Sequence, residues 1–460
     1  MAKQAPLLLA YYGDDFTGSS DALDFLSRAG VKTVLFIAPP TPEQLARYEG
    51  IEAIGIAGMT RSMNPEDMEK ELKVAFSALK DSGAAQVHYK VCSTFDSSPK
   101  IGSIGKAIDV GAKIFNHNYI TLLVAAPQLG RYCAFGNLFA RMGIGSQGEI
   151  HRLDRHPSMS KHPTTPVDES DLRLHLGKQT DKKVGLVDIL EVEGEEASLE
   201  KALLRELEDQ AEVVLFDALY PDQMPKIGRL IDQAGQEKTH FSVGSSGVEM
   251  ALGAYWKYKG KIDQEINWSH PGRATPMLVV SGSGSPVTSG QISWALDHGF
   301  EGVALDPEKV IAEKNGLDGY VEEVKAKMAA GKSVVIHTAL GSDDPRMALT
   351  KKLLTQNGIA SEEVSSKTAD LFGKALGSIA RQVAQEIRYQ RLLIAGGDTS
   401  SKVARVLGIE AVEMIAPLVP GAPLCKAFAP GSPLDGVEVN FKGGQVGAED
   451  YFGSVEKGEN

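Results

Sequence analysis

The chain has 460 residues, of which 42% are hydrophobic and 23% charged, and its formal net charge at pH 7 is -12. These values are typical of a globular protein, and the length favours two or three domains. The negative charge argues against non-specific binding to nucleic acid or to anionic membranes. The apolar run Leu7–Ala10 is too short for a signal peptide, and no stretch approaches the length of a transmembrane span.

Cysteine usage indicates a reducing compartment. The chain contains Cys92, Cys133 and Cys425, and none of them belongs to a CxxC pair. This pattern predicts neither a zinc site nor a disulfide framework. We therefore expect a cytoplasmic protein whose thiols are free.

Short apolar runs alternate with amphipathic segments of helical length in the first half of the chain. Helices such as Pro65–Lys80 and Glu195–Asp209 are expected between strands. This alternation predicts mostly parallel sheets with both faces covered. The predicted strands are Leu7–Tyr12, Val31–Ile37, Ala53–Ala57, Gln86–Val91, Ile120–Ala126, Val184–Ile189, Glu212–Phe216 and His240–Val243.

A polar segment from Lys257 to Ala274 separates this half from a second α/β series. We predict an α/β fold with two domains, residues 1–262 and 263–460. Residues 143–165, rich in His, Ser, Gly and Pro, are expected to form a functional loop or flap. The strands predicted for the second domain are Met277–Ser281, Gly302–Leu305, Ser333–His337, Arg391–Ala395, Val412–Ile415 and Glu438–Phe441.

The first strand is followed by the run Gly13-Asp14-Asp15-Phe16-Thr17-Gly18. Ligands of parallel sheets gather at the carboxyl ends of the strands. Adjacent carboxylates there can bind substrate hydroxyls, hold a metal or act as a base. A cluster of helix N-caps is the alternative, because Asp and Thr favour that position.

The strand that ends near Lys90 is also followed by polar residues, among them Ser93, Thr94 and Asp96. An ammonium, several hydroxyls and a carboxylate suit a sugar-like acid. Part of this content is explained equally well by capping of a helix that begins near Pro99.

Two arginines also follow predicted strands. Arg61, within Thr60-Arg61-Ser62, is suited to clamp a carboxylate in bidentate fashion, although a surface salt bridge explains it as well. Arg131 stands beside the turn Pro127–Gly130. His151, His156 and His162 lack metal-ligand spacing, and we expect no metal site fixed by the protein itself.

Three glycine turns in the second domain are candidate phosphate sites. Ala395-Gly396-Gly397-Asp398-Thr399 lies between a strand and a helix, where backbone N–H groups can approach an anion closely. Ser281-Gly282-Ser283-Gly284-Ser285 has the same context, but Val287 stands where a dinucleotide motif has its third glycine. Lys442-Gly443-Gly444 is a third candidate or a plain terminal hairpin.

Taken together, these segments resemble the four-carbon acid sugar kinase family, over nearly the whole chain and in one order from Asp14 to Gly447. The matching segments are Asp14–Gly18, Thr60–Ser62, Lys90–Ser98, His162–Pro166, Ser281–Ser285, Gly396–Ser400 and Lys442–Gly447. The resemblance implies an N-terminal sugar-acid-binding domain and a C-terminal nucleotide-binding domain. It also implies ATP-dependent phosphorylation of a terminal hydroxyl on threonate, erythronate or 3-oxotetronate, with a branched oxo acid such as 3-oxo-isoapionate as the alternative.

From residue chemistry, we expect the two substrates to face each other across a closing cleft, with Mg²⁺ bridging the ATP phosphates. Asp15 or Asp96 is predicted to orient or deprotonate the attacking hydroxyl. The predicted substrate-binding residues are Asp14, Thr17, Arg61, Lys90, Ser93, Thr94 and Arg131. The predicted nucleotide-binding residues are Ser281, Ser283, Gly396, Gly397, Asp398, Thr399, Gly443 and Gly444.

Two other functions stay open at the level of sequence. A non-catalytic sugar-acid sensor would bind ligand without releasing ADP. A dehydrogenase is suggested only by the incomplete glycine pattern at Gly282. The sequence leaves open the oligomeric state, with a homo-oligomer among the options, the stereochemistry of the substrate and the identity of the hydroxyl that is phosphorylated.

Overall fold

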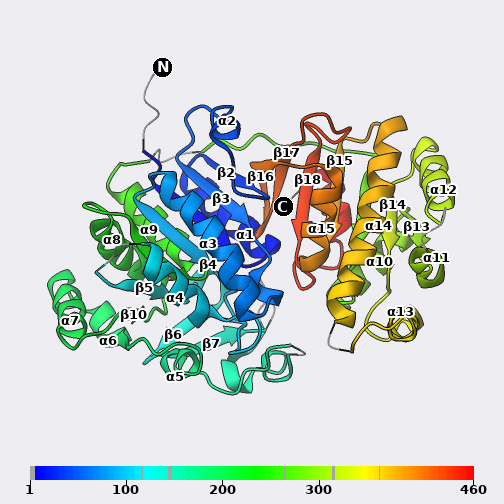
Figure 1. Cartoon of the computed structure of the whole chain (residues 1–460). Coiled ribbons are helices and arrows are strands. Elements are labelled where there is room, and N and C mark those ends of the chain that lie inside the picture. The colour runs from blue at the N-terminus through cyan, green and yellow to red at the C-terminus, as the bar shows by residue number, and fades with distance from the viewer. Residues whose placement is uncertain are drawn as a thin grey trace. The chain divides into compact units, whose positions relative to one another are not determined.

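The computed structural model describes residues 6–115, 118–142, 148–162, 164–262, 266–312, 316–361 and 363–459. Within these ranges, only the side chain of Asp398 is not described. The chain forms two compact units, Met1–Ile266 and Asn267–Asn460 (Figure 1). The division predicted at residues 262 and 263 falls in the same polar segment. None of the helices in the described ranges is long and apolar enough to cross a membrane.

The first unit is built on a parallel sheet with the strand order β2-β3-β1-β4-β11-β5-β10-β9. Every residue of β1, β3, β4 and β11 is buried, so both faces of the sheet centre are covered, as the apolar runs predicted. The strands are β1 Leu9–Gly13, β2 Thr33–Phe36, β3 Ala53–Ala57, β4 Gln86–Lys90, β5 Ile120–Leu123, β9 Val184–Val187, β10 Val213–Phe216 and β11 His240–Gly244.

Helices connect these strands and cover the sheet, and α1 packs against α9, α8 against α9 and α3 against α4. The two helices named from the sequence are α3 and α7, each with ends within one residue of the prediction. The helices are α1 Phe16–Ala29, α2 Pro42–Leu45, α3 Pro65–Asp81, α4 Ile104–Ile114, α5 Leu172–Leu176, α6 Ile189–Glu193, α7 Glu196–Glu208, α8 Met224–Ala234 and α9 Gly247–Tyr258.

Strand register brings three strand ends to one level. Gly13, the last residue of β1, lies opposite Ala57 of β3 on one side and Lys90 of β4 on the other. On the far side of β4, Lys90 lies opposite Gly244 of β11. The loops that leave β1, β3 and β4 therefore begin side by side.

A small antiparallel sheet also belongs to this unit, and the sequence did not predict it. It has the order β6-β7-β8, with β6 Arg131–Ala134, β7 Asn137–Arg141 and β8 Ile150–Arg152. These strands are short, and their residues alternate between buried and partly exposed positions instead of forming apolar runs. The segment predicted as a functional loop contains β8 and two 3-10 turns, while its residues 143–147 and 163 lie outside the described ranges.

The second unit has a mixed sheet with the order β13-β14-β12-β15-β18-β17-β16. Its strands are parallel from β13 to β18 and antiparallel from β18 to β16. Strand β17 was missed because Pro423 interrupts its pattern, although Pro420-Gly421 is a turn signal before it. The strands are β12 Leu278–Ser281, β13 Glu301–Ala304, β14 Val334–His337, β15 Arg391–Ala395, β16 Ala411–Val419, β17 Ala422–Phe428 and β18 Glu438–Lys442.

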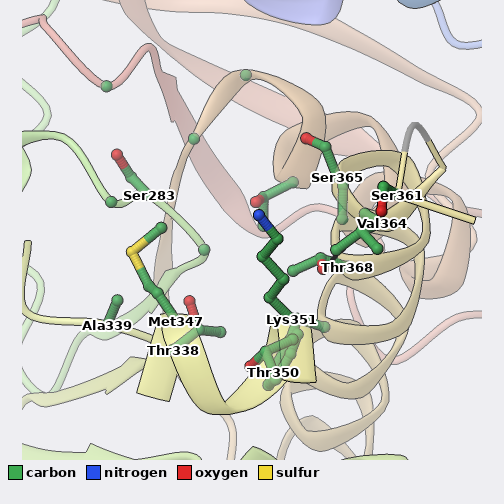
Figure 2. A pocket seen from close by; sticks show the side chains of 18 residues that line it. Ser283, Thr338, Ala339, Met347, Thr350, Lys351, Ser361, Val364, Ser365 and Thr368 are labelled. Carbon is green, nitrogen blue, oxygen red and sulfur yellow. Dashed lines mark hydrogen bonds between the residues drawn. The ribbon is translucent and has the colours of Figure 1, made fainter. Parts of the chain in front are cut away.

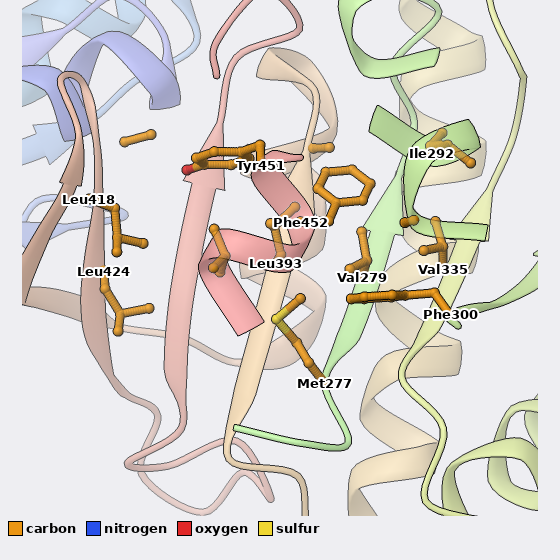
Figure 3. Close-up of a cluster of buried hydrophobic side chains, with 14 of the residues drawn as sticks. Met277, Val279, Ile292, Phe300, Val335, Leu393, Leu418, Leu424, Tyr451 and Phe452 are labelled. Atoms are coloured by element: carbon orange, nitrogen blue, oxygen red, sulfur yellow. The ribbon is translucent and has the colours of Figure 1, made fainter. Parts of the chain in front are cut away.

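Helices of the second unit enclose a continuous core (Figure 3). The helices are α10 Pro286–Asp297, α11 Pro307–Ile311, α12 Asp318–Ala329, α13 Pro345–Gln356, α14 Val364–Glu386, α15 Gly397–Leu407 and α16 Tyr451–Lys457. In the core, Tyr451 and Phe452 of the short C-terminal α16 meet apolar residues of β12, β14 and β15. Packing rather than length therefore stabilises this helix.

We expect Phe452→Ala to lower the free energy of unfolding by about 3–5 kcal/mol, because it empties a site that is 0% exposed. Urea unfolding followed by circular dichroism measures the change. Leu190→Ala is the control, since that side chain is 69% exposed. Equal midpoints for the two variants would show that α16 is not part of the stabilising core.

Candidate active site

Asp15 is the centre of a set of hydrogen bonds at the end of β1. It is the N-cap of α1, and its Oδ1 accepts a 2.7 Å hydrogen bond from the backbone N–H of Gly18. Its Oδ2 accepts hydrogen bonds from Thr17 Oγ1, at 2.7 Å, and from Arg61 Nη2. Burial would raise the pKa of Asp15, but the charge of Arg61 and these donors outweigh it and hold the pKa below its usual range.

Asp14 has different surroundings from its neighbour. The residue is 2% exposed, and its Oδ1 has no hydrogen-bond partner in the part of the chain that the structure describes. Burial is the main reason that its pKa rises to about 7, with Asp15 adding to the rise and Arg61 opposing it. Two adjacent carboxyl groups thus have pKa values that are shifted in opposite directions.

Lys90 is the last residue of β4, and its charged side chain is buried. Its Nζ donates to the carbonyl of Val91 at 2.9 Å and lies 3.5 Å from Asp21 Oδ2 of α1. Burial lowers the pKa of Lys90, but Asp21 and Asp14 outweigh it, and the pKa is raised. The ammonium is therefore retained at neutral pH.

The loop after β4 supplies further polar groups beside Arg61. Thr94 Oγ1 donates to Asp96 Oδ1 at 2.7 Å, and Asp96 Oδ2 lies 3.9 Å from Arg61 Nη1. Phe95, between them, has a φ of 57°, a left-handed conformation that is rare for an aromatic residue. Burial raises the pKa of the Cys92 thiol to about 11, so this cysteine is an unreactive thiol.

Arg61 joins these elements. It lies in a 3-10 turn, Thr60–Ser62, just after β3, and its backbone N–H donates to the carbonyl of Asp14 at 3.0 Å. Its side chain reaches Asp15 and Asp96 and remains 27% exposed. The guanidinium is thus fixed by carboxylates and still accessible to a ligand.

Arg131 is placed differently from Arg61. Its Nη1 donates to the carbonyls of Leu129, Gly130 and Arg141, at 3.0, 3.3 and 3.1 Å. These bonds tie the start of β6 to the end of β7. Arg131 is 6% exposed, and burial lowers its pKa. Its Nε has no hydrogen-bond partner among the described residues, and Asp96 and Asp21 oppose the lowering of its pKa, so its predicted substrate role stays a prediction.

The other predicted substrate residues lie in the same region as Asp14 and Arg61. Ser93 and Thr94 are 7% and 8% exposed, in the loop after β4. Thr17 lies in the first turn of α1 and donates to Asp15. The sequence thus grouped these residues correctly at the strand ends of the first unit. Asp21 belongs to the same polar run after β1, but it was given no role of its own, and the structure places it in α1, paired with Lys90.

A cavity of about 520 Å³ lies within the second unit (Figure 2). Its walls include residues of the three predicted glycine turns, namely Gly282, Ser283, Gly284, Gly396, Gly397, Thr399 and Gly444. Ser281, at the end of β12, and Gly443 lie next to lining residues, and the side chain of Asp398 lies outside the described part. Segments that are far apart in sequence thus meet at one cavity.

Steric contacts explain the glycines of these turns. A Cβ at Gly282 would lie 2.2 Å from Thr399 Oγ1. A Cβ at Gly444 would lie 3.0 Å from Ser283 Oγ. Gly396 has a φ of 119°, in the region that favours glycine, and immediately precedes the N-terminus of α15. Close backbone packing and a helix N-terminus together form a cradle suited to phosphate.

The sequence missed the other wall of the cavity, which comes from α13 and α14. Figure 2 shows Lys351 of α13 extending into the cavity, opposite hydroxyls of α14. These residues belong to amphipathic helices without a recognisable motif. The lining residues from these helices are Met347, Thr350, Lys351, Val364, Ser365, Thr368, Ala369 and Phe372.

Lys442 lies buried beneath this cradle. Its Nζ donates to Thr288 Oγ1 at 2.9 Å, and Thr288 Oγ1 donates to the carbonyl of Gly444 at 3.0 Å. Burial lowers the pKa of Lys442 to about 7. The chain of hydrogen bonds fixes the position of Gly444 relative to α10.

Among the described residues, no group of three or more His, Cys, Asp and Glu side chains is placed to hold a metal ion.

Comparison with known proteins assigns a class to the two units. Residues 9–252 match a family described as a sugar-binding N-terminal domain, and residues 278–452 match a nucleotide-binding C-terminal domain. The chain is 41% identical over 459 residues to 3-oxo-isoapionate kinase of Paraburkholderia graminis, covering 99% of this chain and 95% of that protein. It is 27% identical over 453 residues to 3-oxo-tetronate kinase of Pseudomonas savastanoi pv. phaseolicola, covering 98% and 97%.

Solved structures share the fold. A crystal structure from Salmonella typhimurium LT2 has a TM-score of 0.78 at 24% identity, covering 98% of this chain and 99% of that one. Haemophilus influenzae protein HI1011 has a TM-score of 0.70 at 24% identity, covering 97% and 99%.

The two domains and these relatives define a sugar-acid kinase, a phosphotransferase with a sugar-binding and a nucleotide-binding domain. The chain belongs to the four-carbon acid sugar kinase family. The resemblance, the α/β fold and the kinase activity predicted from the sequence are confirmed.

We expect Gly282→Ala to weaken nucleotide binding by at least about tenfold, equivalent to about 1.4 kcal/mol. The added methyl group would collide with Thr399 at the cradle. Nucleotide-dependent protection against heat measures the affinity. Gly319→Ala in α12 is the matched control, because a Cβ there meets no atom within 4 Å. If both variants bound nucleotide like the parent, the cradle would not be the phosphate site.

Proposed function

We propose that this kinase transfers the γ-phosphoryl group of ATP to a terminal hydroxyl of a small oxo sugar acid, with 3-oxo-isoapionate as the first candidate substrate. The identity of 41% to the kinase of that name, against 25% to 28% for 3-oxo-tetronate kinases, favours the branched acid. A 3-oxo-tetronate is the second candidate. The branched acid, the alternative substrate at the level of sequence, is therefore the first candidate.

The observation that carries this proposal is the grouping of Arg61, Asp14 and Lys90 at the carboxyl ends of β3, β1 and β4, which are in register. A small oxo acid presents one carboxylate and several oxygen atoms over a short span. In the proposed complex, the exposed edge of Arg61 holds the carboxylate, and Lys90 provides positive charge beside it. Thr17, Ser93 and Thr94 offer hydroxyls to the remaining oxygen atoms.

Asp15 and Asp96 keep Arg61 in place for this role. Both carboxylates pair with the guanidinium, and each also accepts a hydrogen bond from a threonine two positions away in sequence. A cation fixed from two sides loses little conformational freedom when a carboxylate binds.

On the nucleotide side, we propose that the glycine turns bind phosphates and that Lys351 neutralises part of their charge. The apolar side chains of Val364 and Phe372 offer a surface for the base. Mg²⁺ would compensate the charge on the phosphoryl oxygens. In the proposed complex, phosphate oxygens and water supply most of the ligands of the ion, since Mg²⁺ usually keeps several waters and binds substrate phosphates.

ADP release with Mg-ATP and a panel of acids tests this function. The panel contains 3-oxo-isoapionate, D- and L-3-oxotetronate, D- and L-threonate and D- and L-erythronate. We expect the highest kcat/KM for 3-oxo-isoapionate. A higher value for any four-carbon acid would overturn the substrate assignment, and silence on the whole panel would overturn the proposed function.

We expect Arg61→Lys to raise the KM for the acid by at least about tenfold, because lysine cannot form the bidentate contact. Nucleotide protection against heat should stay unchanged. Arg173→Lys is the control, since Arg173 forms a comparable contact with Asp171, at 2.6 Å, outside this region. An unchanged KM in Arg61→Lys would mean that another group binds the carboxylate.

A further inference from the structure

The carboxylates around Arg61 and Lys90 differ in how many of their oxygens have a hydrogen-bond or ion-pair partner. Both oxygens of Asp15 accept hydrogen bonds. Asp96 accepts from Thr94 and faces Arg61, while Asp21 pairs with Lys90. Asp14 Oδ1 and Asp21 Oδ1 are both buried and, among the described residues, without a hydrogen-bond partner, but only Asp14 lies directly at the end of β1 and has no ion pair of its own among those residues.

The backbone of Asp14 is held firmly while its side chain is left unsatisfied. Its N–H donates to the carbonyl of Lys90 at 2.8 Å, and its carbonyl accepts from the N–H of Arg61 at 3.0 Å. A buried carboxylate oxygen without a donor is costly, and such groups are rare in folded proteins. A ligand hydroxyl at this oxygen would remove that cost.

The first turn of α1 lies close to this oxygen. A Cβ placed on Gly18 would lie 3.8 Å from Asp14 Oδ1 and 3.3 Å from Lys90 Nζ. The same Cβ would lie 2.5 Å from Asp15 Oδ1, which excludes a side chain at this position. Any side chain at position 18 would therefore crowd the carboxylates and Lys90, and glycine is the residue that avoids this.

We propose that Asp14 is the general base of the phosphoryl transfer, a role that rests on the proposed function. The proton of the attacking hydroxyl passes to Asp14 Oδ1 as the hydroxyl oxygen bonds to the γ-phosphorus of ATP. The bond between that phosphorus and the β–γ bridging oxygen breaks, and its electron pair leaves with ADP. Asp15 and Asp96, the bases predicted from the sequence, then act as positioning residues for Arg61.

The protonation behaviour of the two aspartates agrees with this division. A general base is most effective when its pKa is near the working pH, and burial raises the pKa of Asp14 to about 7. The pKa of Asp15 is held below its usual range, which makes its carboxylate a weaker proton acceptor. Two adjacent carboxyl groups with separated pKa values commonly have different roles.

Steady-state kinetics of Asp14→Asn, Asp15→Asn and Asp96→Asn across pH 5 to 9 test the assignment. We expect Asp14→Asn to lower kcat by about 10²–10⁴-fold, with little change in KM for either substrate. In the parent, kcat/KM should rise with pH and level off above about 7, as Asp14 loses its proton. This inflection should disappear in Asp14→Asn. The two positioning variants should raise KM and keep the inflection.

Asp217→Asn is the matched control for the pH profile. Asp217 is also a fully buried carboxyl, and burial raises its pKa to about 6, but it accepts a hydrogen bond from Gly136 N at 3.1 Å. It follows β10, which β11 and β5 separate from β4 in the sheet. Its variant should keep the parental inflection. A loss of the inflection there, or its retention in Asp14→Asn, would overturn the assignment to Asp14.

Thermal unfolding without substrates gives a readout that is independent of activity. Because the folded pKa of Asp14 is raised, its ionisation destabilises the fold increasingly as the pH rises from about 4 to 7. Asp14→Asn should therefore raise Tm more at pH 8 than at pH 5. A lower Tm at pH 8 would mark Asp14 as a structural residue and refute the proposal.

The outcomes separate the two claims. An active parent enzyme with an active Asp14→Asn variant would refute the base assignment and leave the kinase function standing. A parent enzyme that is silent on every acid of the panel would refute the proposed function and, with it, the role of Asp14.

Discussion

The ion pair between Arg61 and Asp15 is the interaction on which the first unit's site depends. Asp15 caps α1, and through Arg61 it connects the loop after β1 with the loops after β3 and β4. The charges of this region are largely buried, so the loss of one partner would leave the others uncompensated. Such a network tolerates burial only because cations and carboxylates lie at the same level of the sheet.

The cavity of the second unit differs from the site of the first unit in the groups that line it. The cavity is lined by glycine backbone, hydroxyl groups and the N-terminus of α15 rather than by a network of ion pairs. Backbone N–H groups and helix dipoles bind phosphate without a permanent charge that must be compensated before the ligand arrives. Lys442 lies buried beneath the cradle, and burial lowers its pKa to about 7.

Much of this fold could be predicted because parallel strands that are buried on both faces have continuous apolar sequences. Every predicted strand is present in the structure, with ends shifted by a few residues. Strand β17 and the β6-β7-β8 sheet were missed, since Pro423 breaks one pattern and alternating exposure hides the other. The wall formed by α13 and α14 was missed because helical lining residues resemble an ordinary amphipathic face.

The sequence by itself determined the α/β fold class, the family and the grouping of polar residues at strand ends, because apolar runs and glycine turns are local properties of the chain. Only the tertiary structure distinguished Asp14 from Asp15. The two residues are adjacent and chemically identical, and their difference arises from which oxygen meets Gly18, Thr17 and Arg61 in space. Burial and donor geometry depend on contacts that are distant in sequence, and these contacts set the pKa of each carboxyl group.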